Sequence, residues 1–218
     1  MAKTLGEINE AILTQRIHAL LTRPKTQELI QRYFNPIGEE PFAGDLFDTL
    51  GENLPITFGR DDLLSLNLLD EPVNAHQVKR VTSGEFDALL AEVCPTAHIT
   101  NLSGATFEKA SALWEALSDV KGFGPTRISK LLARKRPNLL PIRDSVVNRV
   151  LEIKGYSWWS ALSETMTDTK VVGLLTELRP TPNKQGPSLL RVLDVAIWMH
   201  GSGSAAARNV RQEFGLPN

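Results

Sequence analysis

The chain has 218 residues, of which 42% are hydrophobic and 22% are charged, with a net charge of −1. This composition excludes general disorder and is typical of a globular protein. Cys94 is the only cysteine, which excludes an internal disulfide or a four-cysteine cluster, and no apolar run approaches the roughly 20 residues that cross a bilayer. The first ten residues lack the apolar core of a signal peptide, so we expect a cytoplasmic protein without membrane contact.

In chain order, apolar residues at helical spacing predict helices in the first half, separated by loops rich in Pro and Gly. The stretch 71–78 is expected to be extended, and Ser83 is a candidate N-cap for the helix that follows it. The predicted helices of this half cover residues 5–22, 25–34, 45–50, 60–69 and 83–93.

The second half is also helical by the same criteria, and no sustained alternating strand pattern or repeat occurs. We predict an all-α fold of about ten helices in one compact domain. If the domain has lobes, we expect an N-terminal lobe (1–103), a core (104–152) and C-terminal helices (153–218). The predicted helices cover residues 104–120, 125–135, 144–154, 158–166, 168–179, 189–198 and 205–214.

The segment Val120-Lys-Gly-Phe-Gly-Pro-Thr-Arg127 connects two of these amphipathic helices. Its glycines permit a tight turn and close approach of another chain. Pro125 suits the first position of a helix, whose free amides attract an anion. The segment therefore predicts a grip for one phosphate, and the alternative is an ordinary turn that uses Gly to end a helix.

With Leu117, Leu131 and Leu132 included, this segment resembles the helix-hairpin-helix motif of DNA-repair proteins and polymerases. The resemblance implies duplex DNA as partner, held through a backbone phosphate without reading of the base sequence. It assigns phosphate binding to the amides of Gly122, Gly124, Thr126 and Arg127, and a structural K⁺ or Na⁺ to the carbonyls of Ser118, Val120 and Phe123. Ile128 departs from the small residue that many members have for close packing of the helices.

The charge distribution favours the same segment, because residues 121–150 hold eight basic side chains and one acidic one. This stretch has a net charge of +7 and the remainder of the chain −8. Lys130 and Arg143 would add cations to a DNA-binding surface. The alternative is a solvated helix face, with Arg134, Lys135 and Arg136 placed favourably at a helix C-terminus.

Twenty residues after Gly124, Asp144 begins a helix in the run Ile142-Arg-Asp-Ser-Val-Val-Asn-Arg149. This layout resembles the helix-hairpin-helix DNA glycosylases, which implies a glycosylase-like bundle for the fold and a catalytic role for Asp144. A carboxylate is suited to stabilising the positive charge that develops on the sugar as an N-glycosidic bond breaks. Asp144 is equally explained as a helix N-cap.

The resemblance also has gaps. Thr126 stands where the bifunctional glycosylases have their Schiff-base lysine, so only a monofunctional enzyme is expected. No spacing selects a second acid among Glu39, Glu40, Asp45, Asp48, Asp61 and Asp62. A flipped base needs an aromatic or apolar wall, for which Phe123, Tyr156, Trp158 and Trp159 are candidates, or else core residues.

The whole chain resembles, more loosely, an uncharacterised family of bacterial proteins found mainly in actinobacteria, through residues 42–50, 61–69 and 131–137. That resemblance implies no reaction. Nucleotide-cofactor motifs and metal-ligand spacings are absent from the sequence. Three hypotheses follow: a DNA-binding protein, a monofunctional DNA glycosylase, and a helical protein-interaction module in which the hairpin only packs.

Overall fold

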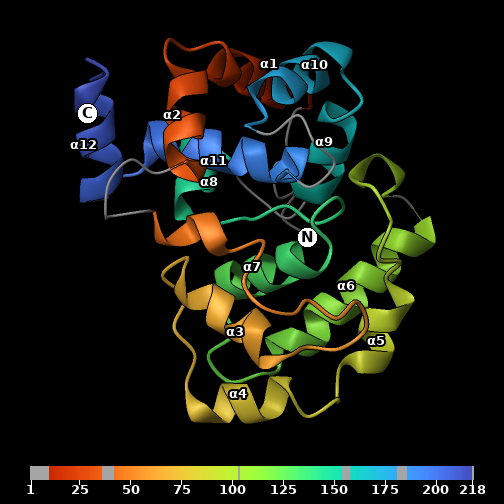
Figure 1. Cartoon of the computed structure of the whole chain (residues 1–218). Coiled ribbons are helices and arrows are strands. Elements are labelled where there is room, and N and C mark those ends of the chain that lie inside the picture. Colours follow the sequence, from red (N-terminus) through yellow and green to blue (C-terminus); the bar gives the residue numbers. More distant parts are fainter. Residues whose placement is uncertain (1–9, 36–41, 103, 154–157, 181–185, 218) are drawn as a thin grey trace, which may run out of the picture. The chain divides into compact units, whose positions relative to one another are not determined.

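The computed structural model describes residues 10–35, 42–102, 104–153, 158–180 and 186–217. These residues form twelve α-helices and two 3₁₀ helices and contain no strand (Figure 1), so the all-α prediction is confirmed. None of the helices in these ranges is long and apolar enough to span a bilayer. The helices are α1 (Glu10–Leu21), α2 (Thr26–Phe34), η1 (Ala43–Leu46), α3 (Arg60–Asn67), α4 (Ala75–Val81), α5 (Asp87–Glu92), η2 (Ile99–Asn101), α6 (Gly104–Ser118), α7 (Pro125–Lys135), α8 (Ser145–Val150), α9 (Trp158–Thr165), α10 (Thr169–Leu178), α11 (Leu189–Gly201) and α12 (Ala205–Glu213).

The chain divides into two compact units. Unit 1 combines both ends of the chain, Met1–Phe42 and Asp144–Asn218, and unit 2 is the continuous stretch Ala43–Arg143. The lobe boundaries expected after residues 103 and 152 do not coincide with this division. The hairpin between α6 and α7 therefore belongs to unit 2, whereas Asp144 is the first residue of the second part of unit 1.

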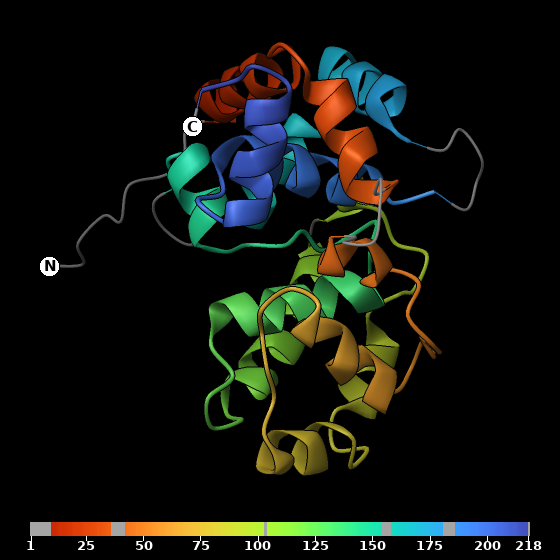
Figure 2. The same cartoon turned by 60° about the vertical axis from the view of Figure 1, so that its left-hand side comes forward.

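Unit 1 is organised around α11, which contacts α1, α2, α8, α10 and α12 (Figures 1 and 2). The sequence explains this position, because nine of the thirteen residues of α11 are buried and apolar residues occupy all its faces. The buried Arg191 is paired with Asp194 and also donates to the Tyr33 hydroxyl at 2.9 Å. A polar pair in the middle of an apolar helix is thus satisfied internally.

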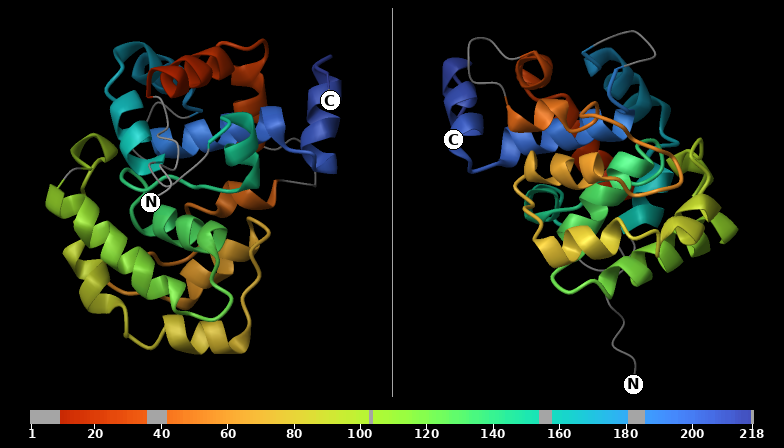
Figure 3. Two further views of the ribbon diagram at one scale, coloured as in Figure 1. Left: turned by 180° about the vertical axis from the view of Figure 1, so that it is seen from behind. Right: turned by 60° about the horizontal axis from the view of Figure 1, so that its bottom comes forward.

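Unit 2 is organised around α7, which packs against α3 and α6 (Figure 3, left). Ile128, Leu131 and Leu132 of α7 are at most 1% exposed. In the last turns of α7, Ala133 packs with Ile142 and with Phe47 from the turn after η1. Helix α7 is thereby enclosed along most of its length.

The main local error of the sequence prediction concerns residues 71–78, which are not extended throughout. Helix α4 begins at Ala75, because Asn74 and Gln77 form a reciprocal capping box: the Gln77 amide donates to Asn74 Oδ1 at 3.1 Å, and the Asn74 amide donates to Gln77 Oε1 at 2.9 Å. The predicted helix from Ser83 is also shorter, since α5 begins only at Asp87. Residues 5–9 of the first predicted helix lie outside the described residues.

Candidate functional site

The hairpin between α6 and α7 is a tight, internally bonded turn over residues 119–124. The Val120 amide donates to the Leu117 carbonyl at 3.1 Å, and the Phe123 amide donates to the Val120 carbonyl at 2.8 Å. Val120 and Phe123 are buried, 1% and 5% exposed, and anchor the turn on the unit 2 core. Gly122, Gly124 and Pro125 are exposed. The apolar residues of the motif thus face inward and its glycines face outward.

The two glycines of the turn differ in what the fold demands of them. Gly122 has φ +82°, a conformation that favours glycine, and a Cβ there would lie 2.8 Å from Nε2 of Gln77, so the Gln77 side chain would have to shift. Gly124 has φ −83° and ψ 171°, which any residue adopts, and a Cβ there would meet no atom within 4 Å. The fold of this chain does not explain the glycine at position 124.

Gly124 is the N-cap of α7, and it offers no side chain to the amides of the first turn. Pro125 at the first helical position has no amide, so the N–H groups of Thr126 and Arg127 are those without an acceptor inside the helix. Free amides and the positive end of the helix dipole together favour an anion at this point. Exposed Lys121 adds a full positive charge on the same turn.

Helix α4 braces the turn from the side. Nε2 of Gln77 donates to the Lys121 carbonyl at 3.1 Å, and the Arg80 guanidinium donates to the Asp119 carbonyl at 2.6 Å. Arg80 also pairs with Glu85 at 3.0 Å, a hydrogen bond that raises the pKa of Arg80 and lowers the pKa of Glu85. These contacts tie the turn to α4, and no local pattern in the sequence indicates them.

Arg127 and Lys130, two predicted DNA-binding side chains, are turned back into unit 2. The Arg127 guanidinium donates to the Gly122 carbonyl, lies 5.6 Å from the centroid of the Phe123 ring, and pairs with Glu71 at 3.3 Å. Nζ of Lys130 donates to the Leu69 carbonyl at 2.8 Å, and Lys130 is only 7% exposed. The backbone amides of Thr126 and Arg127 remain at the N-terminus of α7, whereas the side chains of Arg127 and Lys130 are bonded to other groups of unit 2.

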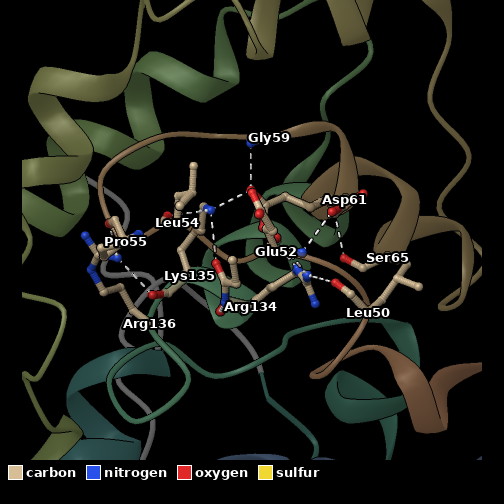
Figure 4. A network of polar contacts seen from close by, with 12 residues as sticks. Leu50, Glu52, Leu54, Pro55, Gly59, Asp61, Ser65, Arg134, Lys135 and Arg136 are labelled. Atoms are coloured by element: carbon tan, nitrogen blue, oxygen red, sulfur yellow. Dashed lines mark hydrogen bonds and ion pairs between the residues drawn. The ribbon is translucent and has the colours of Figure 1, made fainter.

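At the other end of α7, Arg134 and Lys135 are buried among residues of the loop before α3, including Leu50, Leu54 and Pro55 (Figure 4). Both cations pair with one carboxylate, that of Asp62. Nε of Arg134 lies 3.0 Å from Oδ1 of Asp62, and Lys135 pairs with Oδ2. Arg134 also donates to the Leu50 carbonyl, and Lys135 donates to the Leu54 carbonyl at 2.9 Å. Burial lowers the pKa of Lys135, and its hydrogen bond to Asp62 opposes that shift. Both cations are used to hold the segment that precedes α3.

Arg136 completes this buried group and is 1% exposed. It donates from Nε to the Val93 carbonyl at 2.7 Å and from the guanidinium to the Pro55 carbonyl at 2.9 Å. Burial lowers the pKa of Arg136. The three residues lie in the last turn and at the C-cap of α7, so the alternative that places them at a helix C-terminus is confirmed. They form neither a DNA surface nor a solvated helix face, because carbonyl groups of distant loops enclose the run.

The last predicted site residues lie at the boundary of the two units. The Arg143 backbone is tied to unit 2, since its amide donates to Oγ of Ser129 at 3.0 Å and its carbonyl accepts from the same hydroxyl at 3.0 Å. Oδ1 of Asp144 accepts the Val147 amide at 2.9 Å, so Asp144 is the N-cap of α8. The helix start predicted at Asp144 is confirmed.

Several other candidates have structural partners. Asp62 is in the buried ion pairs, and Oδ2 of Asp61 accepts the Glu52 amide at 2.8 Å. Burial raises the pKa of Asp45. Glu39, Glu40 and Tyr156 lie outside the described residues. Phe123 and Trp158 are buried, as core residues would be.

Two observations concern ions. Within the described ranges, no group of three His, Cys, Asp or Glu side chains could hold a metal ion. Of the three carbonyls expected to bind K⁺ or Na⁺, at Ser118, Val120 and Phe123, that of Val120 already accepts the Phe123 amide. The monovalent cation therefore remains a prediction from the resemblance.

Comparison with known proteins gives the family of this chain. Residues 26–201 match the model of a family of unknown function, DUF6308, and the chain belongs to that family. The match includes parts of both units and the whole hairpin. No curated protein and no solved structure matches the chain.

Proposed function

We propose that the protein binds duplex DNA by holding one backbone phosphate at the N-terminus of α7, as in a helix-hairpin-helix motif. The observation that supports this most strongly is Gly124. Its conformation and its surroundings would accept any side chain, and many proteins place Ser, Thr, Asp or Asn at such an N-cap. A glycine there leaves the amides of Thr126 and Arg127 uncapped and lets another backbone approach closely.

In this arrangement the phosphate oxygens accept hydrogen bonds from the free amides, and Lys121 contributes an exposed positive charge on the same turn. Contacts to phosphate position a protein on DNA without reading its sequence. The exposed glycines and Pro125 do not favour the alternative in which the hairpin only packs inside a protein-interaction module. We also propose that the helices form a bundle like that of the helix-hairpin-helix DNA glycosylases, since such a hairpin is expected in that fold.

The direct test is to give α7 the cap that it lacks. Gly124→Ser introduces an oxygen that accepts a first-turn amide, and Gly124→Ala introduces only a methyl group into open space. We expect Gly124→Ser to weaken binding to a labelled duplex about tenfold, the equivalent of one hydrogen bond to a charged group. Gly124→Ala should weaken it less, and both variants should keep the stability of the wild type.

The matched control is Gly203→Ser, because Gly203 is also exposed, precedes a helix, and would place its Cβ more than 4 Å from other atoms. If the wild type binds the duplex and Gly124→Ser binds it equally well, the proposed site is contradicted. An equal loss in Gly203→Ser also contradicts it.

Hydrolysis of an N-glycosidic bond remains the second hypothesis, and it depends on Asp144. Asn is as good an N-cap as Asp, so Asp144→Asn removes the carboxylate and should keep α8 capped. Incubation with duplexes that carry a panel of damaged bases, followed by alkali, detects base removal as strand breaks. Breaks that disappear in Asp144→Asn support this hypothesis; no breaks with the wild type, or equal breaks with the variant, contradict it.

A further inference from the structure

Glu71 is the acidic residue that contacts the hairpin helix near its N-terminus. It lies between α3 and α4, and its backbone is fixed by the hydrogen bond from its amide to the Leu66 carbonyl at 3.0 Å. Asp70, with φ +60°, reverses the chain immediately before it. Asn74 then caps α4, which braces the hairpin through Gln77. The connector thus places one carboxylate at a defined point beside α7.

The two carboxylate oxygens of Glu71 are divided between the two cations of the first half of α7. Oε2 lies 3.3 Å from the Arg127 guanidinium, and Oε1 lies 3.7 Å from Nζ of Lys130. The Glu71 side chain is 19% exposed, and those of Arg127 and Lys130 are 15% and 9% exposed. One carboxylate therefore offsets the charge of both cations that the α7 N-terminus could present to a phosphate.

These contacts are poorly explained as a device for stability alone. Both distances are long for an ion pair, and Lys130 already has the Leu69 carbonyl as acceptor. Nε of Arg127 is buried with no hydrogen-bond partner among the described residues, so the guanidinium is incompletely satisfied in this position. The carboxylate is therefore not held tightly by either cation, whereas its negative charge directly opposes the binding of a second anion beside it.

We infer that Glu71 is an internal competitor for the phosphate, which lowers the affinity of the hairpin for DNA. The inference rests on the proposed function. Glu71 keeps Arg127 folded over Phe123 and the Gly122 carbonyl, and its charge opposes an anion at the first-turn amides. Without that charge, Arg127 and Lys130 add to the positive potential at the hairpin.

The test compares Glu71→Gln, a substitution of the same shape, with the wild type in duplex titrations at several salt concentrations. We expect Glu71→Gln to bind about three- to tenfold more tightly at low salt, with a slope of log K against log [salt] steeper by about one phosphate contact. The control is Glu108→Gln, which makes the same change in net charge at the far end of α6. Adding Arg127→Gln to Glu71→Gln should remove most of the gain, and thermal unfolding checks that each variant is folded.

The outcomes separate this inference from the function on which it rests. Suppose that the wild type binds DNA and that Gly124→Ser weakens this binding. If Glu71→Gln then leaves the binding unchanged or weakens it, the role of Glu71 is overturned and the proposed function is not. An equal gain in Glu108→Gln also overturns that role. Absence of binding in both the wild type and Glu71→Gln overturns the proposed function and the inference together.

Discussion

The two ends of α7 differ in what they expose. At its C-terminal end, Arg134, Lys135 and Arg136 are buried and donate to loop carbonyls and to Asp62. At its N-terminal end, about 16 Å away for a helix of this length, the exposed groups are uncapped amides and Lys121. The end with the larger positive charge is closed to a ligand, and the end with the smaller charge is open.

This difference shows that a basic segment is not the same as a basic surface. The cations of the C-terminal end meet the negative end of the α7 dipole and donate to the carbonyls of Phe47, Leu50, Leu54 and Pro55. They stabilise the path of residues 47–55 and occupy no part of the exterior. Any binding of DNA by unit 2 must therefore depend on few charges and on the geometry of the hairpin.

The largest expected effect concerns the closed end. Arg134→Met leaves Asp62 with one cationic partner, Lys135, beside the Gly59 amide, and it removes the donor of the Phe47 and Leu50 carbonyls. Because buried charges and carbonyls lose their partner, we expect a loss of about 3–5 kcal/mol in the free energy of unfolding. Urea denaturation measures it, with exposed Lys121→Met as a control that should change by less than about 0.5 kcal/mol. A loss for Arg134→Met as small as that of the control would mean that the closed end is not a structural centre.

The second prediction contrasts the two glycines of the open end. Gly122→Ala must adopt a left-handed conformation and displace Gln77, and we expect it to destabilise the protein by about 1–2 kcal/mol. Gly124→Ala enters open space with an ordinary φ and should stay within about 0.5 kcal/mol of the wild type. If thermal unfolding shows that the two substitutions destabilise the protein equally, the fold itself requires glycine at position 124. The argument that Gly124 serves a ligand would then be lost.

A smaller effect is expected from pH. Burial lowers the pKa of Lys135 in the folded protein, so between that value and the unfolded value near 10.5 the unfolded chain binds more protons. The free energy of unfolding therefore gains a contribution that rises with pH in this alkaline window. The stability of the wild type relative to Lys135→Met should increase as the pH rises toward the unfolded value near 10.5. A difference that is constant or falls over this range would contradict the desolvation of Lys135.

The helices of both units could be predicted from the sequence, because their signals are local. Asp144 and Asp168 were expected to begin helices, and each accepts amides of the first turn, at α8 and α10. The spacing of Asn74 and Gln77 is that of a capping box and indicates the start of α4, although we predict extended chain over these residues. The hairpin was likewise predicted from apolar spacing and glycines.

The burial of Arg134–Arg136 could not be predicted in the same way. Their acceptors include Phe47, Leu50 and Pro55, which are 81 to 87 residues earlier in the chain. No local pattern indicates that carbonyls so distant will enclose a basic run. Glu71 was missed for the same reason, since its partners lie more than fifty residues away and only the tertiary structure brings them together.

The salt dependence of binding to duplex DNA tests the central claim most directly, since each phosphate contact with a cation contributes about −0.9 to the slope of log K against log [salt]. If only the open end of α7 binds, with Lys121 and the free amides, the slope should be about −1 to −2. A slope of about −5 or steeper would mean that the basic segment acts as a surface, and an absence of binding at low salt would contradict the account altogether.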